Sequence, residues 1–458
     1  MIRTITKIAA ASALALAAPA VAQSASQTDL QQSYDRALAA GYKALFLCSA
    51  IANAERNGAT RSLESVEEWE LAGIQAPLND IIGELVPSVI RTESGMVQAV
   101  TVAWSDNMPP RAALHDEGAG CSLTPLGFNS NAAIHGSNSI APVPREDVPS
   151  IETSSMPPFI HSAFDGTYGQ DARTTALIVS SGGMQTEFYA PGFDARTPQR
   201  TWSVAKSIAA TLVGAAVHRG QIDVNQSAGL GEDASDPRRA ITIDHGLRMA
   251  TGRYSNTAGN RTDPLYFGGA TVDEVAVDWP LVHLPGSTFR YANNDTLIAV
   301  QAIEHTFAAH PPAAVLAAIG MTGTVAETDW QGNYILSSQA WATAPDLLRL
   351  GQLYLNDGVL PDGTRILPEG WVEYISSPAG PQPGGARGWG YGAGWWLLND
   401  SDGIPPDTFM AAGNRGQYIV VVPSRDIVIA RRGEDPAGGS GFDIEAFTRD
   451  VLAVIGPS

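Results

Sequence analysis

The pattern of hydrophobic positions divides the chain into a shorter N-terminal part and a longer C-terminal part. Residues 30–56 combine an Ala-rich composition with the apolar spacing of a helix, and residues 96–104 (MVQAVTVAW) are typical of a strand. Residues 105–158 are rich in Pro, Gly, Asn and Ser, which predicts loop and linker. We therefore expect an N-terminal accessory segment over residues 23–150 and a separate domain over residues 151–458.

The C-terminal part begins and ends with paired strands. Residues 175–180 and 185–190 flank a Gly-Gly turn, and residues 417–423 and 427–431 flank Ser-Arg-Asp, so each pair predicts a β-hairpin. Helices are expected at residues 203–219, 241–250, 294–308, 344–356 and 443–455. The simplest packing is an α+β fold: one antiparallel sheet flanked by helices, with a large, mostly helical insertion at about residues 220–400.

The first residues of the chain predict export. Arg3 and Lys7 form a basic start, and the apolar run at residues 8–17 is too short to remain as a membrane anchor. Ala20-Val21-Ala22 fits a cleavage site, which gives a signal peptide over residues 1–22. The alternative is an uncleaved, buried helix. No later stretch is expected to span a membrane, so the protein is predicted to be periplasmic or secreted, without a stable membrane anchor.

Charge and cysteine content narrow the choice of partners. The formal net charge of −19 disfavours binding to nucleic acid or to an anionic membrane, since both would repel the protein. Cys48 and Cys121 are the two cysteines, and in an oxidising compartment they predict one disulfide; two buried thiols are the alternative. No His-Glu-x-x-His and no P-loop lysine are present, so neither metal nor organic cofactor is expected.

A candidate nucleophile and base occur at the start of the helix predicted at residues 203–219. Ser203 and Lys206 are one helical turn apart within Thr-Trp-Ser-Val-Ala-Lys-Ser and would share a face. A serine hydroxyl needs a neighbour that takes its proton, and a buried lysine can do so. Lys7 and Lys43 are the other lysines, while arginine, which cannot lose its proton, supplies the remaining basic residues. The alternative is a lysine that extends along the helix to solvent.

Residues 182–214 (GGMQTEFYAPGFDARTPQRTWSVAKSIAATLVG) resemble the strand–turn–strand and active-site helix of the serine β-lactamase and penicillin-binding-protein family. They are most similar to the branch that includes 6-aminohexanoate-dimer hydrolases and related esterases. The resemblance covers about residues 160–455, through the stretches at residues 241–252, 285–300, 346–360 and 413–430. Residues 120–127 (GCSLTPLG) also resemble an exported subgroup of that branch.

The resemblance implies a Tyr-x-Asn motif, which the chain matches at Tyr254, Tyr291 and Tyr354. Tyr354 is expected to pack within a helix, and Tyr254 follows the active-site helix too closely. Tyr291 lies in a loop before a helix, where the family places the motif, so it is the predicted proton shuttle for the leaving group. Asn293 would then bind substrate or orient Lys206.

The third family motif departs from its usual form. Where β-lactamases carry Lys-Thr-Gly, this chain has Asn414-Arg415-Gly416, followed by Gln417 on the strand. Gly416 would leave room for substrate along the strand, and the N–H groups of Gln417 and Ser203 would form the oxyanion hole. Arg415 could replace the lysine that holds a β-lactam carboxylate, or point elsewhere. The missing lysine favours an ester or amide substrate over a β-lactam.

Other constellations are weaker. No Gly-x-Ser-x-Gly elbow is present, and His245, beside Asp244, is expected to satisfy hydrogen bonds in its own helix. Trp389, Trp395 and Trp396 could floor an apolar pocket or simply pack. The sequence therefore predicts an exported serine hydrolase that cleaves a small ester or amide through an acyl-enzyme. A penicillin-binding-type receptor and a D-amino-acid peptidase acting on cell-wall peptides are the alternatives.

Overall fold

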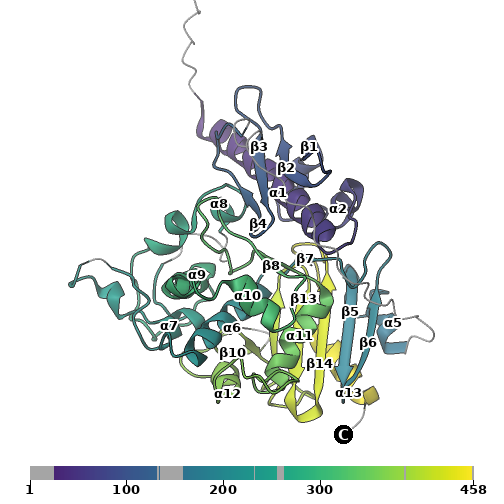
Figure 1. Cartoon of the computed structure of the whole chain (residues 1–458), viewed down its shortest axis with the longest axis vertical. Coiled ribbons are helices and arrows are strands. Elements are labelled where there is room, and N and C mark those ends of the chain that lie inside the picture. Colours follow the sequence, from purple (N-terminus) through teal and green to yellow (C-terminus); the bar gives the residue numbers. More distant parts are fainter. Residues whose placement is uncertain are drawn as a thin grey trace, which may run out of the picture.

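The computed structural model describes residues 25–130, 134, 158–231, 233–254, 262–385 and 388–455. The predicted signal peptide at residues 1–22 and the predicted boundary at residue 150 lie outside these ranges. Within these ranges, the N-terminal segment forms a compact unit that lies above the larger body in the view of Figure 1. We call residues 25–130 the N-terminal unit; its elements are α1 (Gln27–Arg56), α2 (Leu63–Trp69), α3 (Leu78–Ile82), β1 (Pro87–Arg91), β2 (Val97–Val102), β3 (Arg111–Asp116) and β4 (Gly120–Leu123).

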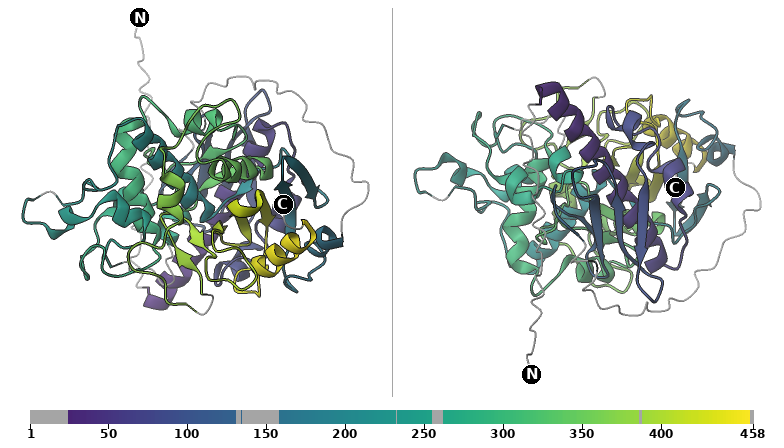
Figure 2. Two further views of the ribbon diagram at one scale, coloured as in Figure 1. Left: turned by 90° about the horizontal axis from the view of Figure 1, so that it is seen from below. Right: turned by 90° about the horizontal axis from the view of Figure 1, so that it is seen from above.

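Helix α1 is the core of the N-terminal unit. The Ser26 side chain accepts a hydrogen bond from the Asp29 N–H in a capping box, which starts the helix. One side of α1 packs on the antiparallel sheet β1-β2-β3-β4, and the other contacts the body (Figure 2, right). A Cβ at Gly41 would lie 2.0 Å from the Phe267 carbonyl oxygen, so glycine allows this close approach. The predicted disulfide is present and joins Cys48 of α1 to Cys121 of β4.

By length and hydropathy α1 could cross a membrane, but its most apolar window is completely buried within the protein, as in a core helix. One expectation for the N-terminal segment was wrong. Residues 105–158 were predicted to be loop, yet they contain β3 and β4. These strands are short, and β3 begins with Arg111, whose buried guanidinium bonds to the Gly268 and Thr124 carbonyls. Pairing with β2, rather than local composition, makes the segment extended.

The body is built on the predicted antiparallel sheet, in which both hairpins take part. Its order is β10-β11-β12-β13-β14-β5-β6. The strands are β5 (Thr174–Ser181), β6 (Met184–Tyr189), β10 (Gly390–Tyr391), β11 (Trp396–Leu397), β12 (Phe409–Gly413), β13 (Gln417–Val422) and β14 (Ile427–Gly433). β10 and β11 lie inside the range predicted to be a helical insertion, so that insertion ends before residue 390.

Helices cover both faces of this sheet, which explains the continuous hydrophobic runs at residues 418–422 of β13 and 427–430 of β14. Ile419 and Val421 face the cluster that contains α11, whereas Val420 and Val422 face the cluster that contains α13. The helices are α5 (Pro158–Ser162), α6 (Val204–His218), α7 (Ile243–Leu247), α8 (Asp263–Tyr266), α9 (Asn293–Ile303), α10 (Pro312–Ala318), α11 (Ala344–Leu355), α12 (Trp371–Ser376) and α13 (Ile444–Ile455). The helices predicted from the sequence are therefore all present, several of them shorter.

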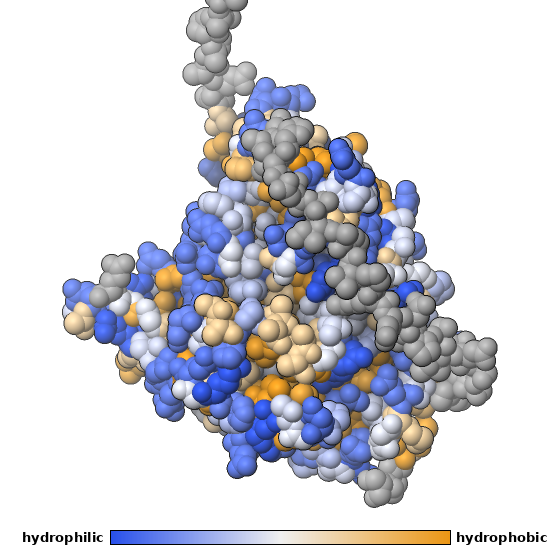
Figure 3. All heavy atoms as spheres, viewed as in Figure 1, coloured by the Kyte–Doolittle hydropathy of each residue, from blue (hydrophilic) through white to orange (hydrophobic). Residues whose placement is uncertain are grey.

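A small sheet connects the body to the N-terminal unit. Its strands, in order, are β7 (Gln199–Arg200), β9 (Ala340–Ala342) and β8 (Val325–Ala326). Trp341 of β9 lies edge-on to Phe46 of α1, and its indole N–H donates to Glu327, which also accepts from the Cys121 N–H. On the face seen in Figure 3, apolar residues occur in small groups among hydrophilic ones, in keeping with the acidic composition.

Candidate active site

Ser203 is placed at the N-terminal end of α6 by the small sheet and by α1. The chain leaves β7 and turns through Trp202, which has a left-handed backbone (φ 49°) that is costly for a bulky residue. The Trp202 ring packs beside Phe46 of α1 and beneath the Arg200 guanidinium. Ser203 follows as the N-cap of a buried helix and remains partly exposed. This turn presents its hydroxyl where helix N–H groups favour negative charge.

Lys206 lies against Ser203 in a neutral environment. Its Nζ donates to Ser203 Oγ (3.1 Å), to Asn293 Oδ1 (2.7 Å) and to the Ser337 carbonyl (2.7 Å). Among the described residues no carboxylate forms an ion pair with it. Burial therefore lowers the pKa of Lys206 to about 7. Lys206 is only 1% exposed, so its side chain does not extend along the helix to solvent.

Of the three Tyr-x-Asn matches, the structure brings Tyr291 to Ser203. The Tyr291 ring lies 5.0 Å from Lys206 Nζ and stacks on Trp396. Burial raises the pKa of Tyr291, and a hydrogen bond with Ser203 acts against that rise. Tyr354 packs in the core and bonds to Thr211, as expected. Tyr254 is exposed, and its partner at position 256 lies outside the described residues.

A cleft of about 320 Å³ opens above Ser203. Aromatic rings of Tyr291, Trp389, Trp396 and Tyr418 form much of its wall. Trp395, in contrast, is fully buried against Tyr354, so two of the three tryptophans singled out by sequence reach the cleft. The remaining lining comes from residues 412–416, residues 435–436 and residues 438–441.

Gln417 does not reach this cleft, which corrects one assignment. It pairs with Gly413 across the β12–β13 turn, is completely buried, and its side chain bonds to Arg432 Nε and Gly433. The segment beside Ser203 is the end of β12: a Cβ at Gly413 would lie 3.2 Å from Ser203 N. Asn414 is exposed and lines the cleft. The backbone beside Ser203 therefore lies before Arg415, whereas the predicted oxyanion residue, Gln417, lies after it; we call residues 413–414 the oxyanion segment, after the role predicted for this part of the site.

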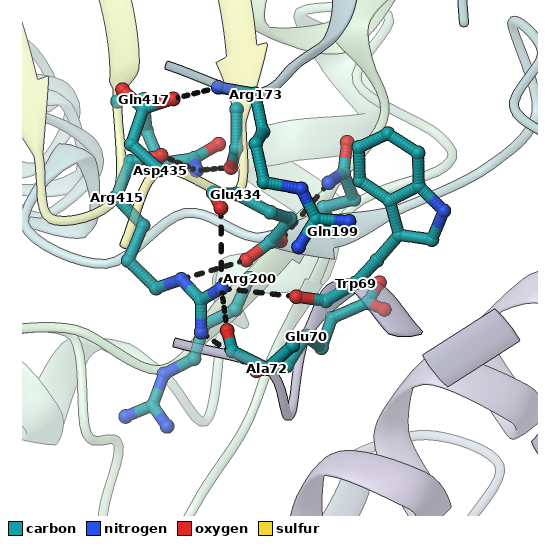
Figure 4. A network of polar contacts seen from close by, with 12 residues as sticks. Trp69, Glu70, Ala72, Arg173, Gln199, Arg200, Arg415, Gln417, Glu434 and Asp435 are labelled. Carbon is teal, nitrogen blue, oxygen red and sulfur yellow. Dashed lines mark hydrogen bonds and ion pairs between the residues drawn. The ribbon is translucent and has the colours of Figure 1, made fainter. Parts of the chain in front are cut away.

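Arg415 lies within the turn, but its guanidinium points to the chain at Glu70 and to Glu434 (Figure 4), so it is not placed to bind a substrate carboxylate. Its side chain is buried, with Nε 3.0 Å from Glu434 Oε2. Burial acts to lower the pKa of Arg415, but Glu434 and Tyr42 raise it above the usual value. Gly416 borders the cleft and is required structurally, since a Cβ there would lie 1.9 Å from Arg431 Nη1.

His245 forms the local contact expected from sequence. Its Nδ1 accepts from the Thr242 N–H in a capping box at the start of α7, and Asp244 pairs with Arg248. Neither residue lines the cleft.

Comparison with known proteins identifies the family. A family model named β-lactamase matches residues 163–432, more than half of the chain. The chain belongs to the β-lactamase family. Ser203, Lys206, Tyr291 and the residue 414–416 turn all lie inside the matched range, whereas the N-terminal unit lies outside it.

Individual relatives of this β-lactamase-family chain are distant. Penicillin-binding protein 4 of Amycolatopsis lactamdurans is 36% identical over 93 residues, which cover 19% of this chain and 24% of that protein's length. A candidate 6-aminohexanoate-dimer hydrolase from Bacillus anthracis has 19% identity and a TM-score of 0.54, over 66% of this chain and 82% of its own. A candidate β-lactamase from Bacteroides dorei has 20% identity and a TM-score of 0.52, over 65% and 97% of the two chains. These structures support the fold.

Proposed function

We propose that this β-lactamase-family protein is an exported serine hydrolase that cleaves an ester or amide bond through an acyl-enzyme on Ser203. The observation that supports it most strongly is the position of Lys206, buried among neutral acceptors with its Nζ 3.1 Å from Ser203 Oγ. A lysine with a pKa of about 7 is free base in a large fraction of molecules at neutral pH.

In acylation, Lys206 Nζ accepts the Ser203 proton while Ser203 Oγ attacks the carbonyl carbon. The developing oxyanion is stabilised by the Ser203 N–H at the start of α6 and by a backbone N–H of the neighbouring Gly413–Asn414 segment. The bond to the leaving group then breaks, and Tyr291 protonates that group. Lys206 returns its proton to Tyr291, so both groups regain their starting states.

In deacylation, water attacks the acyl carbon of the Ser203 ester. Lys206, acting directly or through Tyr291, accepts the proton of the water, and the Ser203–acyl bond breaks. Ser203 Oγ leaves with that proton, which frees a carboxylic acid and the resting enzyme. Asn293 orients Lys206 throughout, since its Oδ1 accepts one of the lysine hydrogen bonds.

The walls of the cleft favour a neutral substrate with an apolar group. Four aromatic rings line it, and the Arg415 guanidinium is buried elsewhere. A β-lactam carboxylate would lack the usual motif lysine, because Asn414 stands at that position of the cleft wall. We expect slow or absent β-lactam hydrolysis.

Export to the periplasm or medium is supported by the sequence of residues 1–22 and by the disulfide between Cys48 and Cys121. Mature N-terminal sequencing after expression in a secreting host tests it: cleavage after Ala22 is expected, and an intact Met1 in the exported fraction would contradict it.

Labelling of the purified protein with a fluorescent fluorophosphonate tests the nucleophile. Intact mass should show one adduct on the wild type and none on Ser203→Ala. Ser207→Ala is the matched control, because Ser207 bonds to the Gly394 carbonyl away from the cleft. Labelling that persists in Ser203→Ala would overturn the proposal.

The stretch similar to penicillin-binding protein 4 favours two alternatives, a receptor that stays acylated and a cell-wall peptidase. Turnover separates these possibilities. A hydrolase releases p-nitrophenol from p-nitrophenyl butyrate in large molar excess over enzyme, a receptor stops after one equivalent, and a peptidase prefers D-alanyl-D-alanine peptides.

A further inference from the structure

We propose that Arg415 is a positioning residue through which the N-terminal unit holds the oxyanion segment against Ser203. The N-terminal unit, which lies outside the range of the family model, would then be a working part of the active site. This inference rests on the proposed function, because it concerns how that site is kept in its reactive geometry.

Arg415 connects the turn at residues 414–416 to the N-terminal unit (Figure 4). Nη1 donates to the Glu70 carbonyl (2.7 Å), and Nη2 donates to the carbonyls of Trp69 (2.9 Å) and Ala72 (2.7 Å). Nη2 also lies 3.3 Å from the Glu434 carbonyl. One planar guanidinium therefore bonds at the same time to the end of α2, to the residues that follow α2, and to Glu434 after β14. A lysine could not make this set of contacts.

The backbone of the turn is strained, so contacts such as those of Arg415 are needed to hold it in this conformation. Arg415 has φ 60°, a left-handed conformation that costs a non-glycine residue free energy, and Gly416 follows with φ 81°. On the opposite side of the turn, Gly413 is pressed against the start of α6, since a Cβ there would lie 2.4 Å from the Thr201 carbonyl oxygen. The turn is thus held between the Ser203 end of α6 and the N-terminal unit.

Two other contacts bring the same unit to the cleft. The Ala437 N–H donates to the Gly73 carbonyl (2.8 Å), and its neighbours Pro436 and Gly438 line the cleft. Phe46 of α1 packs against Trp202, the residue before the nucleophile. The N-terminal unit therefore supports three separate segments around Ser203, and Arg415 is the contact closest to the oxyanion segment.

Displacement of an oxyanion donor weakens binding of the transition state more than binding of the substrate. Loss of the Arg415 contacts should therefore lower kcat while KM changes little. We would compare Arg415→Lys with the charge-balanced double variant Arg415→Asn/Glu434→Gln, since asparagine tolerates a left-handed backbone. Because the double variant could unfold, Arg415→Lys provides the more conservative test.

Arg248→Gln/Asp244→Asn is the matched control. It removes another ion pair between mostly buried side chains, but Arg248 bonds to the Tyr374 and Ser377 carbonyls, and neither residue of the pair lines the cleft. All variants are assayed as the full mature chain with p-nitrophenyl butyrate, together with thermal unfolding and fluorophosphonate labelling of the wild type.

We expect kcat to fall about 10²-fold in the double variant and about 10-fold in Arg415→Lys, with KM within about 2-fold of wild type. The control should keep the wild-type kcat even if its Tm falls as far. Folded Arg415 variants with wild-type kcat, or a control with an equal loss of kcat, would overturn the inference. If the wild type itself is not labelled at Ser203, the proposed function fails instead, so the two failures are distinguishable.

Discussion

Two sides of the cleft carry buried basic side chains whose surroundings differ. On one side, Lys206 is in contact with a hydroxyl, an amide oxygen and a carbonyl, none of which carries a charge. On the other, Arg415 pairs with Glu434, and Arg431 forms a two-point pair with Asp435 at 3.0 and 2.9 Å. We call these the lysine side and the arginine side.

The difference shows how one buried basic side chain is suited to proton transfer while others stabilise the structure. Without a counter-ion, burial favours the neutral form of Lys206, which can take a proton. With counter-ions and carbonyl acceptors, the guanidinium groups stay charged and fix backbone segments in place. A counter-ion placed beside Lys206 should therefore keep it charged and inactive as a base, and loss of a counter-ion on the arginine side should destabilise the fold.

The largest effect is expected when the lysine side receives a cation that cannot lose its proton. Lys206→Arg should lower kcat/KM for p-nitrophenyl butyrate on the order of 10⁴-fold or more, because no neutral base remains beside Ser203. Lys206→Met removes the amine without adding bulk or charge and should lose as much activity while it keeps the wild-type Tm. Activity within 10-fold of wild type in either folded variant would remove Lys206 from the mechanism.

A large effect on stability is expected when the arginine side loses a counter-ion. Asp435→Asn leaves the Arg431 guanidinium buried without its carboxylate, which should destabilise the fold by about 3–5 kcal/mol. Urea unfolding at pH 7 measures the change. Glu84→Gln is the control, since its pair with Arg36 is solvent-exposed and contributes about 1 kcal/mol or less. If both variants lose the same free energy of unfolding, burial is not the reason that the ion pairs of the arginine side stabilise the fold.

The lysine side could be predicted well from the sequence. Ser203 and Lys206 are one turn apart on a helix that is otherwise apolar, so local geometry alone brings them together. Strands β5, β13 and β14 were equally clear, because a sheet covered on both faces leaves long apolar runs. Tyr291 needed the family resemblance, since two other Tyr-x-Asn matches have the same local pattern.

The arginine side could not be predicted in the same way. The direction of Arg415 depends on Glu434 and on carbonyls at residues 69–72, which are more than 340 positions away in the chain. Gln417 was misplaced because sequence does not show on which side of a three-residue turn the strand meets Ser203. Strands β3 and β4 were missed for a related reason: they depend on cross-strand pairing and on the buried Arg111.

A moderate effect is expected at Tyr291, which completes the lysine side. Tyr291→Phe keeps the ring above Lys206 but removes the proton donor, so kcat should fall about 10²-fold or more. Tyr354→Phe removes a buried tyrosine hydroxyl that bonds to Thr211 outside the cleft. It should cost about 1 kcal/mol in unfolding and leave kcat unchanged. An equal loss of kcat in both variants would argue against a role for Tyr291 in proton transfer.

The smallest effect, and the most direct exchange of environments, comes from giving the lysine side a carboxylate. In the wild type, kcat/KM should rise with pH through about 7 as Lys206 loses its proton. Asn293→Asp places an acid where Asn293 Oδ1 now lies, 2.7 Å from Lys206 Nζ. An adjacent negative charge favours the ammonium form and should raise the pKa of Lys206 by about 1–3 units.

The activity of Asn293→Asp should therefore be about 10- to 100-fold below wild type at pH 7 and recover toward pH 9, where the base form returns. Asn293→Ala is the control: it removes the acceptor without adding charge, so any loss should not be restored by alkaline pH. A pH profile of kcat/KM from pH 5 to 10 for all three proteins separates these outcomes. If the acidic limb of the kcat/KM profile of Asn293→Asp stays near pH 7, Lys206 is not the group whose deprotonation limits the reaction. The neutral surroundings of Lys206 would then not be the reason for activity at neutral pH.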